Sequence, residues 1–86
     1  MRVTFHKKFT KKYYACEKKI RLQFKEQLAR FKDDPFDARL NNHRLHGRLK
    51  DFYSINATGD FRAVYRVIDA ETIEFVLFDT HGNLYE

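Results

Sequence analysis

Three short runs in the C-terminal half limit the fold more than any other feature of this sequence. Residues 52–57, 61–68 and 73–79 are rich in aromatic and β-branched side chains, which favour strands. Only "TGD" separates the first run from the second, and only "DAET" separates the second from the third. Connections this short join antiparallel neighbours, because a parallel pair needs a crossover of a dozen or more residues. The sequence therefore predicts an antiparallel meander.

A long amphipathic helix is predicted ahead of these strands. Apolar side chains recur every three or four residues, at Ile20, Phe24, Leu28 and Phe31. This spacing places them on one face of a helix. The helix is expected to end at "DDP", residues 33–35, because a residue that precedes proline is pushed out of helical geometry.

The first part of the chain predicts a strand and another helix. Residues 1–5 alternate apolar and polar side chains, and from His6 the period becomes helical. The two helices are nearly contiguous, so we expect them to fold back as a hairpin around residues 15–19. The predicted order is β-α-α-β-β-β. It describes an α+β fold in which an N-terminal helical hairpin packs on one face of an antiparallel sheet.

Length and composition restrict the class of protein. A chain of 86 residues has room for a single domain, and 43% hydrophobic residues are enough for a packed core. One cysteine allows no intramolecular disulfide, and no ligand cluster predicts a zinc site. The start, "MRVTFHKKF", lacks the apolar segment of a signal peptide, and no apolar run approaches the ~20 residues of a membrane span. We expect a cytoplasmic protein.

The positive charge is unevenly distributed. The formal net charge of +5 favours polyanionic partners, which include nucleic acids, acidic proteins and membrane surfaces. The helical lysines are interpreted as a solvated face. Residues 36–50 show no sustained period and are interpreted as a loop with local turns. This loop carries a second group of cations, Arg39, Arg44, Arg48 and Lys50.

Arg62 and Arg66 lie in the middle predicted strand. Residues two apart in a strand share a face, so both arginines point away from Phe61 and Tyr65. The aromatic face suits the side beneath the helices, which leaves the arginines on the uncovered side. An arginine within a central strand needs a partner or a function. For Arg66 an ion pair with Glu74 is the alternative to function, whereas for Arg62 function is favoured.

Three histidines, His43, His46 and His81, lie in the loop or beyond the last predicted strand. Histidine is the side chain best suited to exchange protons near neutral pH. Each could be an ordinary surface or turn residue. Together with a strand arginine and loop cations, however, they suit cleavage of a phosphodiester, where protons move and negative charge must be stabilised.

The run "HRLHGRLKDFYSINATGDFRAVYRVIDAETIEFVLFDTHGNLY" resembles the RelE/ParE toxin superfamily, and is nearest to its RelE and YafQ-like mRNA interferases. The matching features are Leu45 and Gly47 before a strand, the strand "GDFRAVYRV", and a final strand that ends in a histidine with a tyrosine nearby. The predicted element order is also that of the RelE-like microbial RNase fold. The resemblance implies that residues 1–86 form a single RelE-like toxin domain.

The resemblance implies a ribosome-dependent mRNA endoribonuclease that inhibits translation. RelE-like members cut mRNA in the ribosomal A site without a metal or other cofactor, by attack of the 2′-hydroxyl on the adjacent phosphate. They are toxins of type II toxin–antitoxin pairs, so a cognate antitoxin is an implied partner beside the ribosome and its mRNA. ParE-like members share the fold but act on DNA gyrase, and a non-catalytic RNA-binding member is a third alternative.

Site residues follow from the resemblance by position. The implied catalytic residues are His81, Arg62, Asp60, His43 and Tyr85. The implied RNA-binding residues are Arg44, His46, Arg48, Lys50 and Arg66. YafQ-like members have a further histidine where this chain has Asn56, which leaves the identity of the general base open. Having both His81 and Arg62 argues against the ParE-like alternative.

Overall fold

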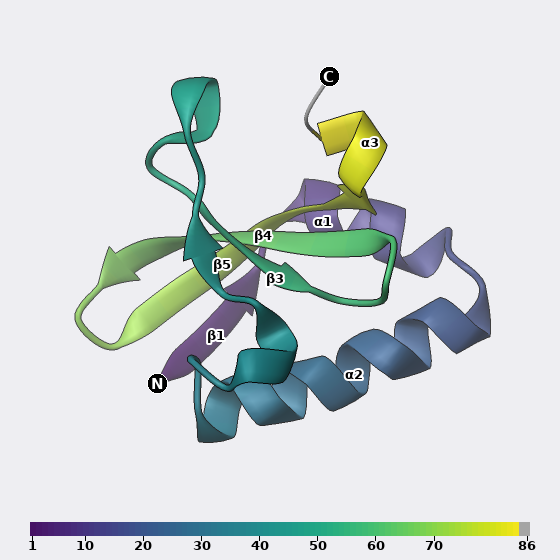
Figure 1. Ribbon diagram of the computed structural model, residues 1–86, viewed down its shortest axis with the longest axis horizontal. Coiled ribbons are helices and arrows are strands. Elements are labelled where there is room, and N and C mark those ends of the chain that lie inside the picture. The colour runs from purple at the N-terminus through teal and green to yellow at the C-terminus, as the bar shows by residue number, and fades with distance from the viewer. Residues whose placement is uncertain (85–86) are drawn as a thin grey trace.

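The computed structural model describes residues 1–84 and forms one sheet with helices against it (Figure 1). The strands are β1 (Arg2–Phe5), β2 (His43–Arg44), β3 (Tyr53–Asn56), β4 (Phe61–Asp69) and β5 (Thr72–Thr80). The helices are α1 (Lys7–Tyr14), α2 (Lys18–Asp33) and α3 (His81–Leu84), with short 3₁₀ turns at Ala38–Leu40 and Gly47–Leu49. The predicted order and the predicted helical hairpin are confirmed. No helix within residues 1–84 is both long and apolar enough to cross a bilayer.

The strand order is β1-β5-β4-β3-β2, and the predicted meander β3–β4–β5 is antiparallel. Two strands extend it. β1 pairs with β5 in parallel, because the α1–α2 hairpin carries the chain back along the sheet before the meander begins. The sheet is therefore mixed rather than wholly antiparallel. β2 lies in the segment predicted as a loop and pairs with β3 over two residues.

The core between the helices and the sheet is built from aromatic rings. Phe9 of α1 is 1% exposed, and its ring centroid lies 5.4 Å from that of Phe24 on α2. The same ring lies 5.6 Å from Phe75 and 5.2 Å from Phe78, both on β5. These separations are favourable for tilted and edge-to-face rings. The cluster fixes α1 and α2 over one face of the sheet, and the opposite, open face carries neither of these helices.

A β-bulge shapes the open face. Val64 of β4 pairs with Leu77, whereas the next residue, Tyr65, pairs with Phe75, so Val76 is the extra residue on β5. The bulge keeps Phe75 beneath the helices and leaves both Val76 and Leu77 half-buried. Ala63 and Tyr65 lie in the core beneath the helices, as the alternation predicted.

The burial decreases toward the end of β4. Val67 pairs with the core residue Ile73, as Tyr65 pairs with Phe75, so it lies on the predicted face of the strand. Val67 is nevertheless 55% exposed and Ile68 is 49% exposed. A second register shift follows, between Val67 and Asp69.

Candidate functional site

Arg62 lies near the start of β4, directly opposite Asn56 on β3 and Asp79 on β5. Its Nη1 donates to the backbone carbonyls of Thr58 and Gly59 at 3.1 and 3.2 Å, and to that of Phe61 at 3.1 Å. These bonds hold the side chain over the β3–β4 turn. A guanidinium has five N–H donors, and within residues 1–84 these three bonds of Arg62 all use Nη1, so Nε and Nη2 are the donors that can serve a ligand.

Arg62 lines a hollow of about 360 Å³ that gathers residues distant in the sequence. The lining residues are Asn41, His43, Leu45, His46, Arg62 and His81. The structure therefore brings together Arg62 and the three histidines that the sequence singled out. Their chemical roles remain predictions, but their common location is a feature of the fold.

His81 is the first residue of α3, and its position is fixed through the backbone. Its N–H donates to the carbonyl of Asp60 at 2.9 Å, which joins the end of β5 to the β3–β4 turn. The turn itself is closed by Thr58, whose hydroxyl accepts from the N–H groups of Asp60 and Phe61 at 3.2 and 2.9 Å. The imidazole thus starts from an anchored backbone, and His81 is exposed to solvent.

Asp79 is the second anchor of α3. Its Oδ1 accepts from the Thr80 N–H at 2.8 Å and from Nδ2 of Asn83 at 3.0 Å, while Oδ2 lies 3.4 Å from Nζ of Lys12 on α1. Burial disfavours the carboxylate, but the bonds from Asn83 and Thr80 and the nearby Lys12 outweigh it and lower the pKa of Asp79. The sequence did not single out Asp79. The sequence feature that could have indicated its role is an acidic residue and a threonine just before a short helix, because both residue types bond N–H groups at helix N-termini.

His43 on β2 is held in one tautomer. Its Nδ1 lies 2.8 Å from the carbonyl oxygen of Asn41, and a carbonyl only accepts, so Nδ1 carries the proton in this contact. In the neutral ring Nε2 then presents a lone pair. An imidazole held in this way is suited to accept a proton.

The remaining predicted site residues within residues 1–84 are not among those that line this hollow. Asp60 sits in the turn and supports His81 through its backbone carbonyl, and Tyr85 lies outside the described residues. Arg66 forms the ion pair considered from the sequence, with Nε and Nη2 both 2.9 Å from Oε1 of Glu74. Of the implied RNA-binding residues, His46 lines the hollow, whereas Arg44, Arg48, Lys50 and Arg66 are not among its lining residues.

The loop beside the hollow is a closed unit. Leu45 is 4% exposed, and its N–H donates to the carbonyl of Phe52 at 2.9 Å, which joins the two ends of the loop. Within it, Nε of Arg44 donates to the carbonyl of Lys50 at 2.7 Å, and its Nη2 lies 3.9 Å from Asp51. Arg48 and Lys50 are exposed on this loop.

A buried glutamine supports the site, and no sequence pattern indicates this role. Nε2 of Gln27 on α2 donates to the carbonyls of Arg39 at 3.0 Å and Asn56 at 2.9 Å. Its Oε1 accepts from Arg30 at 2.7 Å. Gln27 thereby ties the helix to the strand residue opposite Arg62. The side-chain oxygen of Asn56 is buried and has no hydrogen-bond partner within residues 1–84.

Comparison with known proteins gives one family and a set of similar folds. The family described as "ParE toxin of type II toxin-antitoxin system, parDE" matches residues 3–85. YafQ from E. coli strain BL21(DE3) has a TM-score of 0.80 at 16% identity, with 100% of each chain covered. RelE in the RelE–RelB complex from Pyrococcus horikoshii OT3 has a TM-score of 0.73 at 24% identity, with 94% of each chain covered.

A third solved structure has a similar fold. The YoeB/ParE toxin from Agrobacterium tumefaciens has a TM-score of 0.77 at 19% identity, covering 94% of this chain and 99% of the other. At such identities the likeness shows the fold. No curated protein sequence matches this one.

Proposed function

Because the chain belongs to the ParE toxin family of type II toxin–antitoxin systems, within the RelE/ParE superfamily, we propose that it is a toxin that cleaves mRNA on the ribosome. The observation that carries this proposal is the hollow in which Arg62 lies with His43, His46 and His81. A protein that acts only by binding has no evident need for three imidazoles around one anchored arginine. Cleavage of a phosphodiester uses a base, an acid and a cation, and this set can supply all three.

The proposed reaction is an attack by the 2′-hydroxyl of the RNA on the adjacent phosphate. Nε2 of His43 takes the proton of the 2′-hydroxyl, since Nδ1 is already held by the Asn41 carbonyl. Arg62 stabilises the negative charge that grows on the phosphate. His81 gives a proton to the leaving 5′-oxygen. The products are a 2′,3′-cyclic phosphate and a 5′-hydroxyl, so no bond to the protein forms.

The exposed cations of the loop suit the partner that such a reaction needs. Arg48 and Lys50 lie on the closed loop beside the hollow, where they can contact ribosomal or messenger RNA. We propose a cognate antitoxin as the second partner, because the family is defined by toxin–antitoxin pairs and the Pyrococcus RelE was solved with RelB. Both targets place the proposed action in the cytoplasm.

A gyrase-directed toxin is the second candidate, and one observation favours it: the matching family is named for ParE. In this alternative the exposed loop cations Arg48 and Lys50 bind a protein target, and the histidines have no catalytic role. The two candidates differ in the product that they leave, which is cut mRNA in one case and trapped DNA breaks in the other.

The deciding experiment is in vitro translation of a reporter mRNA followed by primer extension. The wild-type protein should produce cuts in phase with codons, and Arg62→Ala should produce none. A parallel reaction contains gyrase and supercoiled DNA. Trapped DNA breaks together with intact mRNA would contradict the proposed function and support the gyrase alternative.

A further inference from the structure

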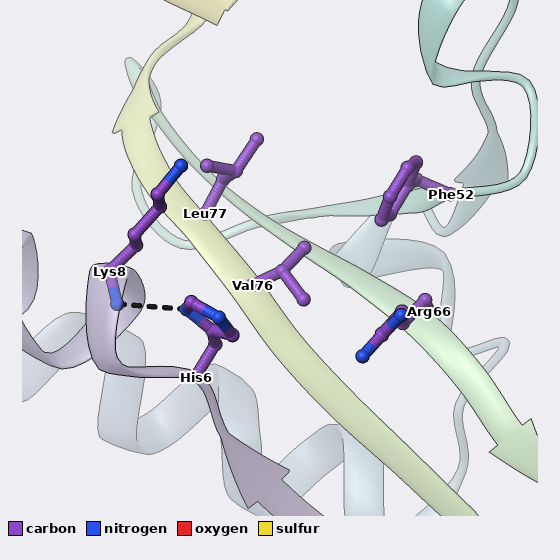
Figure 2. Close-up of a pocket in the computed structure, with 6 residues that line it drawn as sticks. All are labelled: His6, Lys8, Phe52, Arg66, Val76 and Leu77. Carbon is purple, nitrogen blue, oxygen red and sulfur yellow. Dashed lines mark hydrogen bonds between the residues drawn. The ribbon is translucent and has the colours of Figure 1, made fainter.

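A second hollow lies on the open face of the sheet, and its lining residues differ from those of the Arg62 hollow. Its volume is about 290 Å³, and it is lined by His6, Lys8, Phe52, Arg66, Val76 and Leu77. Figure 2 shows His6 and Lys8 on one side of β5, Phe52 and Arg66 on the other, and Val76 between them. The hollow therefore runs from the start of α1 to the base of the closed loop.

The floor of this hollow is apolar because of the β-bulge. Val76 and Leu77 are consecutive residues, and in a regular strand they would point to opposite faces. The register shift places both of them along the same hollow. They provide an apolar surface between the polar side chains of the rim.

The rim presents hydrogen-bond donors. Nδ1 of His6 accepts from the Lys8 N–H at 3.0 Å, so in the neutral ring Nε2 carries the proton and donates. The Lys8 ammonium adds three donors. Glu74 binds Nε and Nη2 of Arg66, which leaves the Nη1 group to serve a ligand. A rim of this kind suits an anion.

The charge balance favours one phosphate over a strongly acidic peptide. Glu74 offsets the charge of Arg66, so Lys8 supplies the net positive charge of the rim. Phe52 offers a ring, and its backbone is held at both ends, with its N–H bonded to Leu49 and its carbonyl to Leu45, each at 2.9 Å. An aromatic ring and a net positive charge on opposite sides of β5 match one base and one phosphate.

The two hollows are connected through the loop and the strand. Leu45 lines the Arg62 hollow, and Phe52, to which it is hydrogen-bonded, lines the second one. Arg62 and Arg66 are four residues apart on β4, which corresponds to about 13 Å of strand. One ligand group cannot occupy both places, whereas an extended polynucleotide can.

We propose that the second hollow is a nucleotide subsite for the substrate RNA, with a base on the Phe52 ring and its phosphate against Lys8 and His6. The proposal rests on the proposed function in one respect, because the same RNA would pass through the Arg62 hollow. It adds a place at which a nucleotide beside the cleavage point is held.

The test measures binding alone, with oligoribonucleotides that are 2′-O-methylated and so lack the attacking hydroxyl. Fluorescence anisotropy gives the affinity for a series from dinucleotide to hexanucleotide. For the wild-type protein, affinity should rise once the chain spans both hollows. Phe52→Leu should weaken the binding of the long oligonucleotides by on the order of tenfold and leave the affinity for the dinucleotide unchanged. Phe52→Tyr keeps the ring and should keep the affinity.

Lysine variants give the matched control. Lys8→Gln should reduce the slope of log affinity against log salt by about 0.7, as expected for the loss of one phosphate contact to a single strand. Lys7→Gln removes the neighbouring lysine of α1, which is exposed and lines neither hollow, and should leave the slope unchanged.

Two outcomes would overturn the subsite. If Phe52→Leu and Lys8→Gln bind the long oligonucleotides as the wild type does, the hollow does not hold RNA. If they keep RNA affinity but lose binding of the antitoxin, the hollow belongs to a protein partner. Because these oligonucleotides cannot be cut, a wild-type protein without nuclease activity would contradict the proposed function and leave this result standing.

Discussion

The Asp79 carboxylate lies 3.4 Å from the Lys12 ammonium, and this ion pair ties α1 to the strand end from which His81 departs. The other oxygen of Asp79 is bonded to Thr80 and Asn83, so one side chain connects two helices. Asp79 is also the cross-strand neighbour of Arg62. It therefore controls the separation between the proposed phosphate contact and the proposed acid.

We expect Asp79→Ala to lower single-turnover mRNA cleavage by on the order of 10- to 100-fold, because small misplacements of a catalytic group have effects of this size. Ribosome binding should change little. Lys12→Gln should reproduce part of the loss, whereas Lys11→Gln should not. In a His81→Gln background, Asp79→Ala should cause no further loss. An additional loss there would mean that Asp79 does not act through His81.

The lowered pKa of Asp79 predicts a pH dependence of stability. A carboxyl group whose folded-state pKa is depressed stabilises the protein fully above its unfolded-state pKa, about 3.9, and loses this effect as pH falls through the folded value. The wild type should therefore melt above Asp79→Asn near neutral pH. The difference should shrink below about pH 4. Thermal unfolding followed by circular dichroism measures it, and a constant difference at all pH values would contradict this assignment.

Arg62→Ala should reduce mRNA cleavage by on the order of 100-fold or more, the usual effect of removing one contact to a transition-state charge. Because Arg62 also binds three turn carbonyls, the melting temperature of the variant must be measured alongside. Arg39→Ala is the control, since Arg39 is an exposed arginine paired with Asp37 outside the hollow. Full cleavage by a folded Arg62→Ala protein would remove Arg62 from the site.

The two histidines should differ in their effect on the pH profile of cleavage. A base must start unprotonated and an acid protonated, so His43→Gln should remove the fall in rate at acidic pH. His81→Gln should remove the fall at alkaline pH. Each variant should lose about 100-fold or more in single-turnover rate. If His81→Gln retains the wild-type rate and still shows the fall in rate at both acidic and alkaline pH, the acid is another residue.

Gln27→Met should destabilise the fold, because it leaves the part-buried carbonyls of Arg39 and Asn56 without the Gln27 donor. An unsatisfied buried acceptor costs about 1–3 kcal/mol. Gln23→Met, at an exposed position of the same helix, should stay within about 0.5 kcal/mol of the wild type. Urea unfolding of both variants gives the comparison, and equal stabilities would contradict the bridging role of Gln27.

The sequence predicts those helices and strands whose pattern lies within one continuous segment of the chain. The apolar period that runs from Ile20 to Phe31 indicates α2, and short turns indicate the β3–β4–β5 meander. The pairing of β1 with β5 has no local signal, because the partners are separated by most of the chain. The bulge at Val76 cannot be predicted from the sequence either, since it lies between apolar residues that fit either face of the sheet.

The residues of the candidate site also fall into those that the sequence indicates and those that it does not. His43, Arg62 and His81 are distinctive residue types and could be selected from the sequence, and the fold brings them together. Gln27 could not, because its role depends on which segments pack beside it. For Asp79 the local bonds to Thr80 and Asn83 have a sequence signal, whereas the contact with Lys12 has none. Arg66 could be interpreted either way until its distance to Glu74 was known.

The pairing of Arg2 with Thr72 also sets the stage of synthesis at which the sheet can close. A chain grows from its N-terminus, so β1 is made first, yet its partner β5 is made only seventy residues later. Contacts across such separations form slowly, and they cannot form while β5 is still inside the ribosome. A nascent chain thus has neither a closed sheet nor α3. The sheet beside the Arg62 hollow can therefore be completed only after residues 72–80 have left the ribosome.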